Sequence, residues 1–214
     1  MVGTVLIFSG GDPLTTESVA GLPTEAVVIG ADSGVDRAHQ AGWDVDVAVG
    51  DFDSISPDGL LRVESRGAVI RRFPVDKNET DLELAIAVAL EMCPERIVMA
   101  AMSGGRPDHE LAGLMLLTDR RLAGVDVDVV LNGGQMSVVF DHRQFRGEVG
   151  DLMSLVPVAG DVTGVTTSGL EYSLVNETLR LAAGRGVSNV CSLPSVDVSI
   201  AGGVLFVYRP DQPS

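Results

Sequence analysis

The sequence predicts an α/β domain with a mostly parallel sheet, followed by a small antiparallel β domain. Two observations favour this fold class. Over the first two-thirds of the chain, short apolar runs that end in glycine alternate with helical patterns, which is typical of buried parallel strands and their covering helices. After about Asp141 the helical patterns stop, and short alternating runs punctuated by glycine, proline and serine replace them.

The first domain is expected to contain apolar strands that each end at a turn signal, at residues 4–8, 25–29, 45–49, 68–73, 96–101 and 127–131. Two helices stand out between them. Residues 80–92 carry apolar side chains on most faces, which predicts a well-buried helix. Residues 108–122 have a similar pattern, and Asp108 is placed to cap the start of that helix.

The second domain is expected to contain strands at residues 152–156, 162–167, 195–200 and 204–208, which predict a β-sandwich or an open barrel. A domain of about 70 residues is only marginally stable alone, so we expect it to pack against the first domain or a partner subunit. The predicted domains are residues 1–141 and 142–214.

The net charge of −15 argues against nucleic acid as a partner, because phosphate backbones are bound by lysine and arginine. A cationic small ligand or a metal held by carboxylates fits this charge, although acidity by itself also keeps proteins in solution. The first residues lack a basic leader, and no apolar run approaches the ~20 residues of a membrane span. We therefore expect no membrane association and a cytoplasmic location.

Charged side chains follow the ends of the predicted strands. In an open α/β sheet, ligands bind beyond the carboxyl ends of the strands, so these residues are the candidates for chemistry. Crowded carboxylates repel one another unless a cation lies among them, and oxygen ligands suit Mg²⁺ shared with phosphates. The candidates for such a Mg²⁺–nucleotide site are Asp32, Asp51, Asp53, Asp76, Asp81, Arg106 and Asp108.

Each candidate also has a structural explanation. Asp32 alone more often makes a turn or caps a helix. Asp51 and Asp53 flank a bulky apolar residue, which places both carboxylates on one side of an extended segment. The acids of residues 76–81 suit a helix N-terminus, where Thr80 is positioned as the cap.

Lys77 is the only lysine among the 15 lysine and arginine residues, and it lies within the acidic 76–81 segment. A lysine provides a compact point charge, whereas arginine provides a broad planar fork. A site that places one positive charge between phosphate oxygens and carboxylates is one explanation, and chance retention of a surface lysine is the other.

The Gly104-Gly105-Arg106 turn lies between a predicted strand and a predicted helix. Glycines at such a turn let backbone N–H groups approach phosphate, and Arg106 can bind phosphate through two hydrogen bonds. His109 is a candidate phosphate or nucleotide contact, although a histidine on a helix is more often packed or solvated. Neither a P-loop nor a GxGxxG motif is present.

Seven segments, in order along the chain, resemble the thiamine pyrophosphokinase family. GADSGVD resembles the family's GADGGAN, VGDFDSI matches its VGDFDSI, DKNETD resembles DKDxTD, and GGRPDH resembles GGRxDH. In the second domain, GLEYSL resembles GLKYPL, and NETL and RGVSN resemble the segments NETL and RGxSN.

This resemblance implies an N-terminal three-layer α/β domain that binds ATP and Mg²⁺, and a C-terminal β-sandwich that binds thiamine and forms a homodimer with active sites between subunits. The implied reaction transfers diphosphate from ATP to the hydroxyl of thiamine. The resemblance also implies roles for particular residues. These are Asp51, Asp53 and Asp81 for Mg²⁺, with Asp32, Asp76 and Thr80 nearby, Lys77, Arg106, Asp108 and His109 on the nucleotide side, and Ser188 and Asn189 at thiamine.

The sequence departs from the family segments at Ser33, Asp36, Asn78 and Val190. Because Val190 borders the expected thiamine pocket, a pyrophosphokinase that acts on another alcohol remains an alternative. A non-catalytic sensor of nucleotide or thiamine on the same fold is a second alternative.

Overall fold

The computed structural model describes residues 2–211 and divides into two compact units. Unit 1 comprises residues up to 116 together with residues 125–132. Unit 2 comprises residues 117–124 and the chain from residue 133 onward. Within the described residues, no helix combines the length and apolar character needed to cross a membrane.

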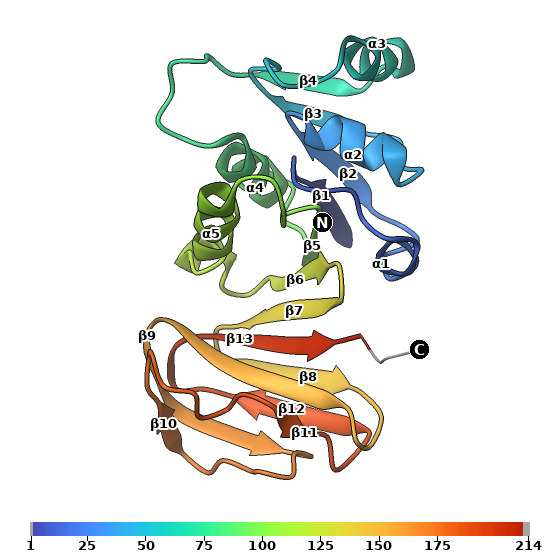
Figure 1. The fold of residues 1–214 in the computed structure, drawn as a ribbon. Helices are drawn as coiled ribbons and strands as arrows, with labels where there is room; N and C mark the ends of the chain where they lie inside the picture. Colours follow the sequence, from blue (N-terminus) through green and yellow to red (C-terminus); the bar gives the residue numbers. More distant parts are fainter. Residues whose placement is uncertain (1, 212–214) are drawn as a thin grey trace. The chain divides into compact units, whose positions relative to one another are not determined.

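Unit 1 is built on a parallel sheet in which the strand order is β4-β3-β2-β1-β5-β6 (Figure 1). Every neighbouring pair in this series is parallel, as the sequence predicts. The strands are β1 (Thr4–Phe8), β2 (Val27–Ala31), β3 (Val47–Gly50), β4 (Val69–Arg72), β5 (Arg96–Ala100) and β6 (Asp126–Leu131).

Helices cover both faces of this sheet. Figure 1 shows α1 (Thr16–Ala20), α2 (Gly34–Gln40) and α3 (Pro57–Arg66) on one face, and α4 (Asp81–Glu91) and α5 (Pro107–Leu116) on the other. This arrangement follows from right-handed crossovers, because the chain moves outward from β1 to β4 and then returns to the other side of β1 with β5. The strand order therefore reverses between β1 and β5.

The sequence explains why these strands are central. Val5 to Phe8 of β1 are fully buried, as are Ile97 and Met99 of β5. Strands of a parallel sheet that are covered on both faces need such continuous apolar runs. Three helices begin with a hydroxyl cap, in which Thr15, Ser56 or Thr80 accepts a backbone N–H from the first turn.

Helix α5 differs from its prediction at both ends. The sequence analysis expected Asp108 to cap this helix. The helix begins at Pro107, so Asp108 lies inside the first turn and is not the cap residue. It ends at Leu116, and a separate 3₁₀ turn follows at Arg120–Leu122, where Asp119 accepts the N–H of Arg121. Local capping by an aspartate therefore starts a new element within the apolar pattern at residues 108–122.

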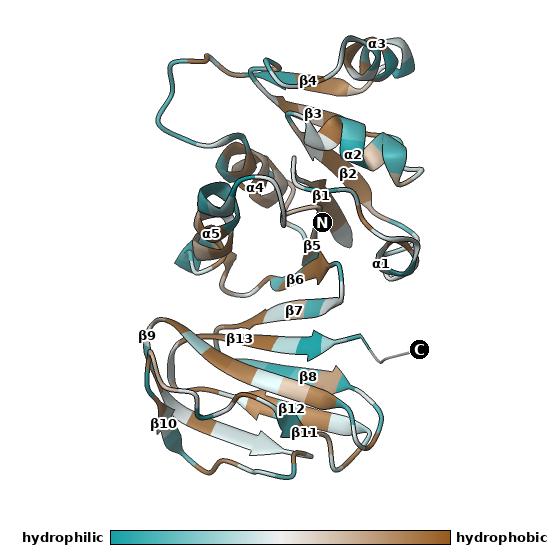
Figure 2. Cartoon of the chain, in the orientation of Figure 1, coloured by the Kyte–Doolittle hydropathy of each residue, from teal (hydrophilic) through white to brown (hydrophobic). Residues whose placement is uncertain are grey.

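Unit 2 is antiparallel, with the strand order β7-β13-β9-β12-β8, and two short strands also pair with β9. Buried and more exposed residues alternate along much of β9, so that one face of the strand lies in the core of unit 2. Figure 2 shows hydrophobic (brown) stretches along this strand. The strands are β7 (Gly134–Val139), β8 (His142–Arg146), β9 (Leu152–Ser168), β10 (Glu177–Leu179), β11 (Asn189–Val190), β12 (Ser195–Ser199) and β13 (Gly202–Pro210).

Strand β9 joins two strands that the sequence analysis expected to be separate. Ala159 and Gly160 have positive φ angles of 58° and 134°, which bend the strand without ending it. The pairing register with β13 shifts at the same place, between Gly202 and Val204. Apolar side chains of β9, β12 and β13 form the core of unit 2, including Leu155, Val162, Val165, Val196, Val198 and Leu205. Strand β7 also belongs to unit 2, and the domain boundary after residue 141 stays a prediction.

Candidate active site at the carboxyl edge of the parallel sheet

A pocket of about 630 Å³ opens at the carboxyl ends of the unit 1 strands. It includes the segments that follow β1 and β5, which is where the strand order reverses and where open α/β sheets bind ligands. Its lining residues come from the ends of four strands, β1, β2, β3 and β5, and from α4 and α5. They include Ser9, Gly11, Asp32, Ser33, Asp51, Asp53, Ser54, Thr80, Asp81, Leu82, Met102, Gly104, Arg106, Asp108 and His109.

The loops after β1 and β5 are held against each other by backbone hydrogen bonds. Gly11 donates to the carbonyl of Ala101, and Asp12 donates to that of Ser103, both at 2.8 Å. Gly104 has a φ angle of 93°, and a Cβ atom there would lie 2.0 Å from Oδ2 of Asp12. Only glycine permits this approach, because a side chain would collide with Asp12 and strain the backbone.

Asp32 follows β2 and is 7% exposed. Its φ angle of 47° is uncommon for a residue other than glycine, and its backbone N–H is bonded to the carbonyl of Val49 at 2.8 Å. Within residues 2–211, its buried Oδ1 atom has no hydrogen-bond partner. Burial raises the pKa of Asp32 above its usual value, and the nearby negative charge of Asp81 adds to this effect.

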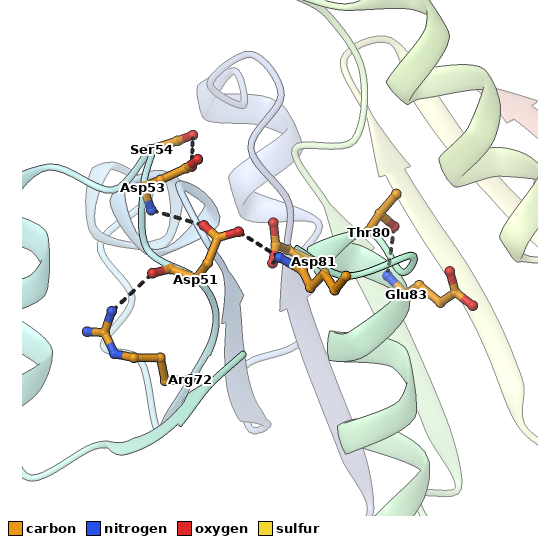
Figure 3. Close-up of polar contacts among 8 residues, drawn as sticks. Asp51, Asp53, Ser54, Arg72, Thr80, Asp81 and Glu83 are labelled. Atoms are coloured by element: carbon orange, nitrogen blue, oxygen red, sulfur yellow. Dashed lines mark hydrogen bonds and ion pairs between the residues drawn. The ribbon is translucent and has the colours of Figure 1, made fainter. Parts of the chain in front are cut away.

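Asp51 and Asp53 lie on the loop that follows β3 (Figure 3). Phe52 between them has a φ angle of 66° and packs its ring into the core, so the two carboxylates lie toward the pocket. Arg72 stacks on the Phe52 ring at 4.8 Å and donates to the backbone carbonyl of Asp51 at 3.0 Å. Asp53 donates its backbone N–H to Oδ1 of Asp51 at 3.1 Å.

Lys77 links two of the carboxylates. Its Nζ atom lies 2.6 Å from Oδ2 of Asp51 and 3.1 Å from Oδ1 of Asp81, and its side chain is only 11% exposed. The hydrogen bond from Lys77 is the main reason that the pKa of Asp51 is lowered. Burial acts to lower the pKa of Lys77, but its hydrogen bond to Asp51 and its ion pair with Asp81 outweigh this and raise it. Lys77 therefore stabilises the ionised form of Asp51, and the two carboxylates stabilise the charge of Lys77.

The donor set fits a divalent cation. One carboxylate oxygen from each of Asp32, Asp51 and Asp53 lies within 4.8 Å of the others, and all the donors are oxygen, which Mg²⁺ prefers. The unpartnered Oδ1 of Asp32 is the kind of buried atom that such an ion would satisfy. The group contains Asp32 and not Asp81, whose Oδ1 lies beside Lys77, so the role of Asp81 as a metal ligand stays a prediction.

The acidic segment at the start of α4 both caps the helix and contributes side chains to the pocket. Thr80 accepts the backbone N–H of Glu83 at 3.2 Å, which caps the helix (Figure 3). Asp81 and Thr80 nevertheless line the pocket. A Cβ atom at Gly50 would lie 3.1 Å from Oδ1 of Asp81 and 3.2 Å from Cβ of Asp32, so glycine lets these two carboxylates meet over the end of β3.

The start of α5 supplies the cationic side of the pocket. Arg106 is bonded to Asp108 by Nε at 3.0 Å and by Nη2 at 2.5 Å, and both side chains are exposed. This pairing holds the pKa of Asp108 well below its usual range. Gly104 donates its backbone N–H to Glu110 at 3.0 Å. The groups predicted to bind phosphate are therefore occupied by carboxylates of the same helix.

Four predicted site residues are not part of the lining of this pocket. Lys77 is related to it through its contacts with the lining residues Asp51 and Asp81. Asp76 is exposed and is not part of the lining. Ser188 and Asn189 belong to unit 2. Asn189 is 3% exposed, and its amide makes three hydrogen bonds within unit 2: it accepts from the backbone N–H groups of Tyr172 and Val190 and donates to the carbonyl of Tyr172.

The sequence analysis missed several lining residues. Leu82 and Met102 form an apolar part of the wall, and Met102 sits just after β5, at a strand end of the kind that supplied the other candidates. Ser54 was missed although it follows Asp53 directly, and it donates to Asp53 at 2.8 Å. Arg72 carried no signal, because its contact with Asp51 depends on the pairing of β3 with β4.

The fold and the pocket together define an α/β protein with a candidate metal site at the carboxyl edge of its parallel sheet. A family model described as thiamin pyrophosphokinase, catalytic domain, matches residues 22–129. A second model, described as thiamin pyrophosphokinase, vitamin B1 binding domain, matches residues 142–205. The chain belongs to the thiamine pyrophosphokinase family.

Known proteins agree with this assignment along nearly the whole chain. The thiamine pyrophosphokinase of Bacillus subtilis (strain 168) is 29% identical over 209 residues, which are 96% of this chain and 98% of that protein. The crystal structure of thiamine pyrophosphokinase from Bacillus subtilis superimposes with a TM-score of 0.84, at 25% identity and with 98% and 100% of the two chains covered. The structure from Geobacillus thermodenitrificans has the same fold, with a TM-score of 0.81 at 23% identity and 99% of each chain covered.

Proposed function

We propose that the pocket of unit 1 binds ATP with Mg²⁺ and that the chain transfers the diphosphate of ATP to the hydroxyl of thiamine. The products are thiamine diphosphate and AMP, as in the family to which the chain belongs. The observation that carries the proposal is the grouping of Asp32, Asp51 and Asp53 oxygens within 4.8 Å of one another, in the pocket where the strand order reverses.

Asp51 and Asp53 would hold Mg²⁺, with Asp32 as a third donor and Asp81 close by. When bound, Mg²⁺ would neutralise negative charge on the phosphate oxygens of the nucleotide. The side chains of the pocket position one another. The contact of Lys77 with Asp51, at 2.6 Å, fixes the direction of that carboxylate and places one positive charge beside it.

Phosphate binding would fall to Arg106 and to the backbone of the Gly104-Gly105 turn, where phosphate would replace the present contacts with Asp108 and Glu110. The thiamine hydroxyl oxygen forms a bond to the β-phosphorus, and the bond from that phosphorus to the oxygen bridging to the α-phosphate breaks. AMP leaves with that oxygen, and the hydroxyl proton passes to solvent. Correct orientation and neutralised charge supply most of the rate in such transfers.

The acceptor side of the proposal rests on unit 2, where the vitamin B1 binding model matches. We place Ser188 and Asn189 near thiamine and propose a cytoplasmic homodimer with active sites between subunits. Light scattering of the purified protein tests the dimer, since a monomeric mass at micromolar concentration would contradict it.

An assay that reads AMP and thiamine diphosphate separately tests the reaction. Purified protein, ATP, Mg²⁺ and thiamine should yield the two products in equal amounts, and chelation of Mg²⁺ should stop both. AMP formation with a different alcohol, but not with thiamine, would show that the acceptor is not thiamine and would implicate Val190 in the difference. A folded protein that binds nucleotide and releases no AMP with any acceptor would favour the sensor alternative.

A further inference from the structure

The loop that carries Asp51 and Asp53 is anchored at its far end by a residue outside the loop. At its near end, Phe52 is buried and Arg72 holds the carbonyl of Asp51 (Figure 3). At its far end, Ser56 meets the carboxylate of Asp36, which belongs to α2. The backbone N–H of Ser56 donates to Oδ2 of Asp36 at 2.8 Å, and its hydroxyl donates to Oδ1 at 2.6 Å.

The same serine also caps α3. Its Oγ atom accepts the backbone N–H of Gly59 at 3.0 Å while donating to Asp36, so both hydrogen-bonding functions of the hydroxyl are used. Charge-assisted hydrogen bonds of this kind are stronger than those between neutral groups. The carboxylate of Asp36 therefore fixes the point where the loop ends and the helix begins.

The position of Asp36 on α2 connects this anchor to a second part of the site. Helix α2 starts at Gly34, two residues after Asp32, so Asp36 lies in the first turn of the helix that follows that carboxylate. Asp32, Asp51 and Asp53 form the candidate metal group, and they come from two different strand ends. Through its two hydrogen bonds from Ser56, Asp36 joins the helix after β2 to the end of the loop after β3.

We propose that Asp36 is a positioning residue for the reaction, which holds the 51–56 loop against α2 and thereby sets the geometry of the three metal-binding carboxylates. The inference rests on the proposed function for its effect on catalysis. It does not place Asp36 in contact with the metal or a substrate. Partners that orient the ligands of a metal change its affinity about 10- to 100-fold when removed.

The kinetic test compares Asp36→Ala, Asp36→Asn and wild type in the AMP-release assay at varied Mg²⁺. Asp36→Ala should raise the Mg²⁺ concentration for half-maximal rate by about tenfold or more, with much of kcat recovered at saturating Mg²⁺. Asp36→Asn should rescue this effect, because an amide accepts from the Ser56 N–H and donates to its hydroxyl. The control Asp58→Asn removes an exposed acidic charge from the same region, in the first turn of α3, and should not alter the Mg²⁺ dependence.

A second variant reaches the same contact without changing Asp36. A Cβ atom at Gly59 would lie 2.3 Å from Oδ1 of Asp36 and 3.0 Å from Oγ of Ser56. Gly59→Ala should therefore displace the carboxylate and reproduce the Asp36→Ala phenotype, although alanine favours the helix itself. If both variants fold and keep the wild-type Mg²⁺ dependence, the proposal is wrong.

A measurement without catalysis separates this inference from the proposed function. Hydrogen exchange of the 51–56 segment should be faster in Asp36→Ala than in wild type and Asp58→Asn, even if the wild-type protein transfers no diphosphate. Equal exchange in all three proteins would overturn the anchoring role of Asp36 whatever the reaction is. Faster exchange combined with an inactive wild type would instead contradict only the proposed function.

Discussion

The ammonium group of Lys77 lies 2.6 Å from Oδ2 of Asp51, and it also lies 3.1 Å from Oδ1 of Asp81. The side chains of Lys77 and Asp51 are only 11% and 8% exposed, so the three groups occupy a confined space. A compact ammonium fits between two carboxylates at such distances, whereas a guanidinium is broader and planar. The contact gives a physical reason for the single lysine of the chain.

The first prediction is that Lys77→Arg is harmful although it conserves charge. The guanidinium should push Asp51 away from its place in the metal group, and kcat/KM should fall by roughly tenfold or more. Steady-state AMP release at saturating Mg²⁺ measures the effect. Arg71→Lys makes the reverse exchange at an exposed ion pair with Glu91 and should change little. Wild-type kinetics for Lys77→Arg would show that the site does not require lysine at this position.

The second prediction concerns Asp53, which is exposed and contacts Ser54 within its own loop. Asp53→Asn removes a charge and no core contact, so it should lower kcat by about 10²-fold or more while the melting temperature without ligand stays close to wild type. Mg²⁺ with ATP should raise the melting temperature of wild type, because ligands that bind the folded state stabilise it, but should do so less in the variant. Retained activity at saturating Mg²⁺ would remove Asp53 from the metal site.

Much of the fold was predictable because buried parallel strands leave a strong local pattern. The runs at β1 and β5 are apolar after their first residue, and a serine–glycine pair follows each of them within four residues. The extent of α5 was not predictable in this way. Leu111 and Met115 are exposed, so the apolar pattern of residues 108–122 did not report burial. The bend in β9 at Ala159 also escaped prediction, since alanine gives no signal for a positive φ.

The site was predictable as a set of strand-end residues but not as a set of contacts. The rule that ligands bind at the carboxyl edge selected Asp32, Asp51 and Asp81, and all three line one pocket. Which carboxylates face Lys77 and which face each other depends on the loop after β3, whose path is set by Phe52 and Ser56. Those long-range contacts have no local signature in the sequence.

The third prediction is that the buried, charged carboxylate of Asp32 lowers the stability of the folded protein. Because burial raises the pKa of Asp32 in the folded state, the folded chain holds its proton more tightly than the unfolded chain. The unfavourable contribution of Asp32 therefore appears as pH rises through the unfolded pKa of about 3.9 and persists at neutral pH. Asparagine has no such charge and tolerates the positive φ of this position.

Asp32→Asn should accordingly raise the melting temperature at pH 7 in the absence of Mg²⁺, by roughly 2–4 °C for each kcal/mol gained. The gain should shrink toward about pH 4, where the wild-type carboxyl group is increasingly protonated in both states. Calorimetry from pH 4 to pH 8 with a chelator present measures both effects. A variant that is less stable than wild type at pH 7 would show that Asp32 is satisfied within the protein alone.

The fourth prediction separates two roles for Asn189, which the family resemblance placed at thiamine. Its side chain accepts from the backbone N–H groups of Tyr172 at 3.1 Å and of Val190 at 2.9 Å, and donates to the carbonyl of Tyr172 at 2.9 Å. Asn189→Ala should leave these backbone groups unpaired and lower the free energy of unfolding by about 1–3 kcal/mol. Asn189→Asp keeps the acceptor but turns a carboxylate oxygen toward the Tyr172 carbonyl, so it should also destabilise.

Ser188→Ala is the matched control for stability, because Ser188 is exposed and its backbone N–H, not its hydroxyl, bonds to Ser154 at 3.0 Å. Urea unfolding of the three variants, together with the KM for thiamine, distinguishes the roles. Lower stability with a raised KM would mean that Asn189 acts on thiamine by holding the Tyr172 segment in place. Unchanged stability with a raised KM would mean that its amide turns toward the ligand, against the contacts seen in the folded chain.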